Sequence, residues 1–213
     1  MALSQNPVLR AAGFEALPKS MTFKRTERIG LKPVALSKQE KEKAKICIGY
    51  YYYLQTHLEN TGLFKEVFKC FYLRNTRRGN WNENDYNLFF NKMFSFVSTG
   101  NFINEVNSCA AYFQQSMSKG RFELSFSSKL VHTKNTSCPI FDSGVVAYLE
   151  EFEGVRMPNN RAENFATLCT WYDRFVNNDQ RYHSWIEWFN ETFPEYESIS
   201  DIKKIDFILF FGK

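Results

Sequence analysis

The sequence contains few of the residues that are typical of disulfide-rich, fibrous or turn-rich proteins. Its 213 residues include only 10 Gly, 6 Pro and 5 Cys, which argues against collagen-like, low-complexity and turn-dense β proteins. The cysteines are scattered, odd in number and without C-x-x-C spacing: Cys47, Cys70, Cys109, Cys138 and Cys169. We therefore expect reduced, buried thiols in an intracellular protein of the cytoplasm or nucleoid, and neither a disulfide framework nor a zinc knuckle.

Several familiar sequence signals are also absent. No apolar run approaches the roughly 20 residues that span a bilayer, and no signal peptide opens the chain, so we expect no membrane partner. There is no Walker A stretch, no G-x-G-x-x-G loop and no H-E-x-x-H motif, and we therefore expect no metal and no cofactor. A Ser–His–Asp arrangement stays open, although no nucleophile-elbow sequence supports it.

Aromatic residues, in contrast, are abundant, and charge is unevenly distributed. The chain carries 22 Phe, 11 Tyr and 4 Trp, or 17% aromatic residues, which is enough for a well-filled core. The formal net charge is +4. Residues 1–45 carry +6, residues 46–142 carry +3 and residues 143–213 carry −5. This gradient favours one face that meets an anionic partner.

Apolar residues recur at helical spacing along most of the chain, and no stretch alternates as a strand would. Ser37 and Glu40 form a capping-box pattern that opens the first long helix. Spacing, caps and turn residues predict helices over residues 37–58, 63–73, 84–100, 101–117, 127–134, 143–152, 163–176, 182–193 and 200–211. Within these, Asn84 or Asp85 is an expected cap, Phe96 and Val97 belong to an apolar face, and Ser200 is a second candidate cap.

These patterns predict an all-α protein. Residues 1–36 lack sustained periodicity and contain three prolines, which indicates an irregular N-terminal arm. A targeting presequence is the alternative for this stretch, but Glu15, Glu27 and the prolines argue against it. Residues 37–213 are expected to form a single compact multi-helix domain.

One segment differs from ordinary core sequence. Lys129 lies in the first turn of a helix expected to start at Ser127 or Ser128, and Asp142 precedes the next helix. The positive end of a helix dipole lowers the pKa of a lysine, and partial burial lowers it further. The same dipole favours the ionised form of an aspartate at a helix start. A neutral lysine is a nucleophile suited to Schiff-base chemistry. Lys129 and Asp142 are therefore a candidate catalytic pair, with a solvated lysine and a capping aspartate as the structural alternative.

The same residues resemble a known family. A lysine opening a short helix, then an apolar stretch, a proline and an aspartate before a hydrophobic helix resemble the helix–hairpin–helix DNA glycosylase superfamily, in particular its 8-oxoguanine DNA glycosylase-like bacterial branch. The resemblance covers residues 122–149 and implies the fold of that superfamily. It implies a DNA base-excision enzyme, an N-glycosylase with or without AP-lyase activity. Lys129 would attack the damaged nucleotide, and Asp142 would stabilise the positive charge that develops on the sugar.

Two features depart from the family pattern. The glycine-bearing hairpin that donates backbone amides to a phosphate is replaced by residues 125–128. The stretch from Lys129 to Asp142 is also shorter than in typical members. The hydroxyls of Ser127 and Ser128 and the amides of the helix start would hold the phosphate instead.

The resemblance assigns further residues to DNA. His132, on the helical face of Lys129, would tune the lysine or touch a phosphate, with a structural role as the alternative. The remaining candidate DNA contacts are basic or amide side chains, whose alternative is a solvated surface: Arg74, Arg77, Arg78, Asn80, Lys119, Arg121 and Lys134. A flipped base needs a pocket of rings. Candidates for it, each with core packing as the alternative, are Trp81, Phe141 and Trp171.

The implied partner is double-stranded DNA with a damaged or modified base, bound by a monomer without metal or organic cofactor. Two other functions stay open at this point. One is a helical DNA-binding module without catalysis, for which binding would be salt-sensitive. The other is a helical protein-interaction or regulatory protein with an exposed aromatic patch.

Overall fold

The computed structural model describes residues 6–18, 28–31, 33, 35–73, 81–118 and 120–211. Within these ranges all regular elements are helices, and the prediction of an all-α protein is confirmed for them. The elements are α1 (Pro7–Ala11), α2 (Lys38–Thr56), α3 (Gly62–Phe71), α4 (Glu83–Ser95), α5 (Phe102–Ser116), α6 (Leu124–Lys134), α7 (Ser143–Phe152), α8 (Arg161–Asn178), α9 (Arg181–Thr192), the short 3₁₀ helix η2 (Pro194–Tyr196) and α10 (Asp201–Phe211).

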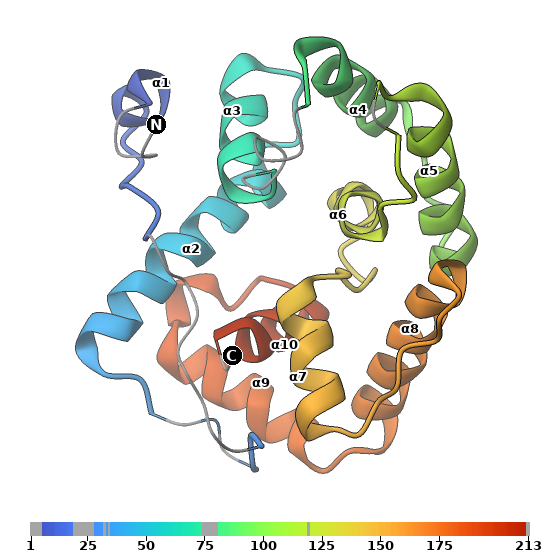
Figure 1. The fold of residues 1–213 in the computed structure, drawn as a ribbon. Helices are drawn as coiled ribbons and strands as arrows, with labels where there is room; N and C mark the ends of the chain where they lie inside the picture. Colours follow the sequence, from blue (N-terminus) through green and yellow to red (C-terminus); the bar gives the residue numbers. More distant parts are fainter. Residues whose placement is uncertain are drawn as a thin grey trace.

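The helices form two groups with α6 between them. In the view of Figure 1, α3, α4 and α5 lie in the upper half, and α7, α9 and α10 lie in the lower half. α5 packs against α6 and α8, whereas α10 packs against α7 and α9. The chain that leaves α6 therefore leads into α7, which packs against α10.

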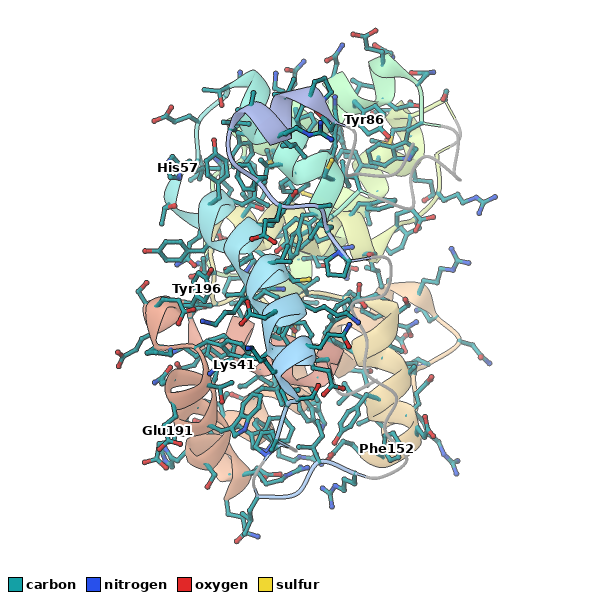
Figure 2. The ribbon with its side chains drawn as sticks, turned by 90° about the vertical axis from the view of Figure 1, so that its left-hand side faces the viewer. Lys41, His57, Tyr86, Phe152, Glu191 and Tyr196 are labelled. Atoms are coloured by element: carbon teal, nitrogen blue, oxygen red, sulfur yellow. The ribbon has the colours of Figure 1, made fainter. Side chains whose placement is uncertain are left out.

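The helix α2 crosses the molecule on one side. Figure 2 shows this side, with Lys41 toward one end of α2 and Tyr196 of η2 beside the helix. The rings of Tyr52 and Tyr196 lie 5.6 Å apart between centroids. Gly49 of α2 permits this approach, because a Cβ at that position would lie 3.2 Å from the Tyr196 hydroxyl. α2 and η2, which are far apart in the sequence, thus pack against each other.

Aromatic rings fill the core, as the composition predicts. Phe68 lies within 6 Å, between ring centroids, of Tyr72, Phe89 and Phe90. Ten polar or charged side chains of the described residues are also buried, and seven of them lie in α6 and α10. The seven are Ser127, Ser128, Lys129, His132, Lys203, Lys204 and Asp206. Such groups are costly to bury without partners, so α6 and α10 are the helices in which to look for a function.

The predicted start and end of α4 are both wrong. Asn82 caps α4, and Asp85 completes the capping box instead of being the cap. α4 ends at Ser95, and Val97 is 81% exposed instead of apolar core. The carboxylate of Glu105 accepts hydrogen bonds from the backbone amides of Thr99 and Gly100. This contact from α5 holds the segment after α4 in a non-helical conformation.

The N-terminal arm is less irregular than predicted. It contains α1, and three of its apolar side chains, Leu9, Leu17 and Ile29, are buried in the common core. The capping box of Ser37 and Glu40 is confirmed. α7 has the predicted bounds, and α9 differs from its prediction by one residue at each end.

Candidate active site

Lys129 and Asp142 lie close together in the folded chain. The Nζ atom of Lys129, in α6, is 4.0 Å from Oδ2 of Asp142, the residue that caps α7. The other carboxylate oxygen of Asp142 accepts a hydrogen bond from the Gly144 amide at 2.8 Å. One oxygen therefore fixes the start of α7 while the other faces the amine, as the prediction that Asp142 is presented at a helix start requires.

The segment between the two residues is hydrogen-bonded to α6. The Ser128 hydroxyl accepts a hydrogen bond from the Phe141 amide at 2.9 Å. The Nδ1 atom of His132 lies 2.6 Å from the carbonyl oxygen of Cys138. Because these contacts flank Asp142 on its N-terminal side, they hold its carboxylate toward α6.

The amine of Lys129 is almost enclosed. It donates a hydrogen bond to the Ser125 hydroxyl at 2.9 Å and lies 5.7 Å from the ring centroids of both Tyr72 and Phe126. Only 9% of the Lys129 side chain is exposed, against 28% of the Asp142 side chain. Burial lowers the pKa of the Lys129 amine below its ordinary value, although the nearby Asp142 carboxylate opposes this effect.

The helix-dipole explanation for this lysine is wrong. α6 begins at Leu124 rather than near Ser127, so Lys129 lies in its second turn. The Ser127 amide and hydroxyl both donate to the Glu123 carbonyl oxygen, which is the bonding of a residue inside a helix. The buried side chain of Leu124 adds one turn to the helix. The altered pKa of Lys129 therefore comes from burial and not from the dipole.

A second buried ion pair adjoins the first. Lys203 Nζ is 3.4 Å from Asp206 Oδ2 in α10, and the hydroxyl of Tyr172 donates a short hydrogen bond to the other oxygen of Asp206. Burial lowers the pKa of Lys203 and raises that of Asp206. The sequence contained a signal for this pair, because charged residues interrupt a helix that is apolar on all sides. No role was assigned to them from the sequence.

Three candidate DNA contacts, Ser127, Ser128 and His132, have fully buried and hydrogen-bonded side chains. Ser127 donates to its own helix, whereas Ser128 joins α6 to the segment before α7. His132 is 1% exposed and bonds the Tyr51 hydroxyl through Nε2 at 2.8 Å. The two ring partners of His132 fit its structural alternative, and DNA contact by any of the three residues stays a prediction.

The candidate pocket residues lie in different places. Trp81 packs on Phe126, 4.9 Å between ring centroids, so it is one ring away from Lys129. Phe141 is half-buried next to Asp142 in the chain. Trp171 instead stacks on Phe175 within the core around α8, as its structural alternative predicts. Of the three candidates, Trp81 is thus linked to the Lys129 amine through the Phe126 ring, and Phe141 is linked to α6 through its amide.

The basic candidates can be placed only in part. Arg121 is exposed just before α6, and Lys134 ends that helix, with its amine 3.4 Å from the Phe94 carbonyl oxygen. The others lie outside the described residues: Arg74, Arg77, Arg78, Asn80 and Lys119. Contact of Arg121 and Lys134 with DNA stays a prediction.

None of the five cysteines forms a disulfide, and four of them are buried while Cys169 is half-buried. Among the residues that the structure describes, no helix is long and apolar enough to cross a membrane. In the same ranges, no three His, Cys, Asp or Glu side chains are grouped so that they could hold a metal ion. No protein-family model, curated protein or solved structure matches the chain.

Proposed function

We propose that the protein is a DNA base-excision enzyme, an N-glycosylase that acts on a flipped, damaged nucleotide of double-stranded DNA. The observation that supports this function best is the 4.0 Å separation between the Lys129 amine and the Asp142 carboxylate. A nearly enclosed lysine, with its pKa lowered by burial, supplies an amine that is able to attack carbon. The half-exposed carboxylate beside it faces the side from which a substrate arrives.

The two side chains have complementary roles in this chemistry. The lone pair of the neutral Lys129 amine forms a bond to C1′ of the sugar while the bond from C1′ to the base breaks. The base leaves with the electron pair of the broken bond to C1′ and takes up a proton. Positive charge develops on the sugar in the transition state, and the Asp142 carboxylate stabilises it electrostatically.

Schiff-base formation follows from the same intermediate. The attached nitrogen loses its proton, its lone pair forms a C=N bond to C1′, and the bond from C1′ to the ring oxygen breaks, with a proton added to that oxygen. The product is a covalent imine between Lys129 and the opened sugar. Hydride from borohydride reduces this imine to a stable amine, which provides a direct test.

Base extrusion also needs stacking partners. Removing a base from the duplex costs a few kcal/mol, which an enzyme recovers through ring contacts and hydrogen bonds. The rings of Tyr72 and Phe126 lie beside the Lys129 amine, Trp81 packs on Phe126, and Phe141 precedes Asp142 in the chain. We therefore assign the flipped base to this side of α6.

Borohydride trapping tests the proposal. The protein is incubated with duplexes that contain 8-oxoguanine, other damaged bases or an abasic site, and covalent adducts are counted by gel and mass spectrometry. We expect an adduct at Lys129 in the wild type, none in Lys129→Ala, and a decrease on the order of 10²-fold in Asp142→Asn. Lys38→Ala removes an exposed lysine at the start of α2 and is expected to leave trapping unchanged.

Two results would contradict the proposal. Normal base excision by folded Lys129→Ala would show that this lysine is not the nucleophile. A wild type that binds duplexes in a salt-sensitive way, yet excises no base from the panel and forms no adduct, would instead support the non-catalytic DNA-binding module.

A further inference from the structure

Lys129 and Lys203 come from different helices but meet at one aromatic ring. Each amine lies 5.7 Å from the centroid of the Tyr72 ring, which follows α3. Lys203 also lies 5.1 Å from the centroid of Tyr51 and 4.6 Å from that of Phe207. Two lysines are thus enclosed in one small aromatic compartment, and the proposed reaction uses only one of them.

Burial lowers the pKa of the Lys203 amine, but its partners oppose this effect and favour the charged form. Asp206 holds its amine at 3.4 Å, and three ring faces attract an ammonium ion. The Tyr172 hydroxyl donates to Asp206 and so stabilises the carboxylate. Only 7% of the Lys203 side chain is exposed, so water screens its charge poorly.

We propose that Lys203, held by Asp206, is a positioning residue for Lys129: its enclosed ammonium disfavours a second positive charge at Tyr72 and keeps the Lys129 amine uncharged and nucleophilic. This inference rests on the proposed function only in taking Lys129 as the nucleophile. Lys203 itself contacts neither the sugar nor the base in this scheme.

The other titratable groups of the compartment do not replace this effect. Burial lowers the pKa of His132 to about 3, so the ring is neutral near pH 7. Burial raises the pKa of Tyr51, Tyr72 and Tyr172, so the phenols are neutral too. The charges that face Lys129 are therefore those of Asp142 and Asp206, which favour its ammonium form, and that of Lys203, which opposes it.

A purely structural role is the alternative. Buried ion pairs contribute little net stability compared with apolar residues of the same size. A measurement of stability alone therefore does not decide between the two roles. The test must report the protonation of Lys129 itself.

The test is competitive labelling without DNA. Wild type, Lys203→Met and Lys203→Arg are treated with trace acetic anhydride over a range of pH, and the acetylation of each lysine is quantified by mass spectrometry. We expect the pH midpoint of Lys129 acetylation to move to higher pH in Lys203→Met, by on the order of one pH unit. Lys203→Arg keeps the charge and should keep the wild-type midpoint, and exposed Lys38 is the internal reference in every sample.

A folded Lys203→Met variant with an unchanged or lower Lys129 midpoint would overturn the inference. If this variant does not fold, Lys203→Met combined with Asp206→Asn removes both charges, and a smaller upward shift is expected because the effect of Lys203 on Lys129 exceeds that of Asp206. An unchanged midpoint in the double variant, or failure of both variants to fold, would show a structural role instead.

The same variants separate this inference from the proposed function. A Lys129 midpoint that depends on Lys203, in a protein that excises no base, would contradict only the glycosylase proposal. Normal excision and trapping with an unchanged midpoint would contradict only the role of Lys203. Where both hold, the pH profile of trapping on an abasic duplex should shift in parallel with the labelling midpoint.

Discussion

His132 has a different partner at each ring nitrogen. Nδ1 faces the Cys138 carbonyl oxygen, which can only accept, so Nδ1 carries the proton. Nε2 then accepts a hydrogen bond from the Tyr51 hydroxyl. This neutral tautomer satisfies both nitrogens, and a second proton would be buried beside Lys203. Burial first, and Lys203 second, lower the pKa of His132 to about 3.

The buried histidine predicts a loss of stability in mild acid. In the unfolded chain a histidine binds a proton below about pH 6.5, whereas folded His132 binds it only near pH 3. The unfolded state therefore gains protons between these values, and each pH unit in this window costs up to about 1.4 kcal/mol. Urea unfolding at pH 7, 6, 5 and 4 should show a smaller decrease for His132→Gln than for wild type. His183→Gln, at an exposed position of α9, should keep the wild-type decrease, and equal slopes in all three proteins would contradict the prediction.

At the scale of elements, α6 positions the segment that follows it. Ser127 and Ser128 are neighbours, are both fully buried, and differ only in what their hydroxyls bond. The Ser127 hydroxyl donates a hydrogen bond within α6. The Ser128 hydroxyl accepts one from the Phe141 amide, 13 residues further along the chain. Only Ser128 therefore links the helix of Lys129 to the residue next to Asp142.

This difference predicts unequal effects of two alanine substitutions. Ser128→Ala leaves the Phe141 amide without its partner, which should lower the free energy of unfolding by about 1–3 kcal/mol. It should also decrease trapping, because the Asp142 carboxylate is no longer held toward Lys129. Ser127→Ala removes a bond to a carbonyl that the Ser127 amide already satisfies, so both quantities should stay close to wild type. Equal losses in the two variants would show that Ser128 has no special positioning role.

At the scale of the whole molecule, Arg181 joins parts of the chain that are far apart in sequence. It pairs with Glu153 after α7 and with Asp179 before α9, and it donates to the Ile29 carbonyl oxygen of the N-terminal arm. Exposed Arg28 pairs with the same Glu153. Burial alone would raise the pKa of Glu153, but hydrogen bonds from Arg181 and Arg28 keep it below its ordinary value. The arm is thus anchored beside α7 and α9.

Removing the carboxylate tests this anchor. Glu153→Gln leaves the largely buried guanidinium of Arg181 with one acidic partner fewer, and we expect a loss of about 2–3 kcal/mol in the free energy of unfolding. Protease digestion should cut the N-terminal arm faster than in wild type. Glu151→Gln changes an exposed glutamate of α7 and should do neither. A Glu153→Gln protein as stable as the control would mean that the network contributes no net stability.

The sequence allowed the helices to be predicted wherever local signals decide them. The Ser37–Glu40 capping box and the bounds of α7 depend on residues a few positions apart, and both were correct. The start of α6 was wrong because burial of Leu124 in the core extends the helix, and the end of α4 was wrong because the Glu105 side chain of the next helix binds the Thr99 and Gly100 amides. The free energy of adding or removing one turn at a helix end is small, so a single side-chain contact can lengthen or shorten a helix by a turn.

For the site, the chain by itself determined an all-helical core rich in aromatic rings and placed Lys129 and Asp142 on either side of one short connection. It left Trp171 indistinguishable from a pocket residue and left Lys203 without a role. Only the tertiary structure decided that Lys129 is enclosed, that the side chains of Ser127, Ser128 and His132 are buried, and that the amines of Lys203 and Lys129 lie at the same ring. The physical reason is that burial and charge proximity depend on which helices pack together. α6 and α10 are separated by more than 60 residues, and no local pattern encodes that a lysine of each lies over the Tyr72 ring.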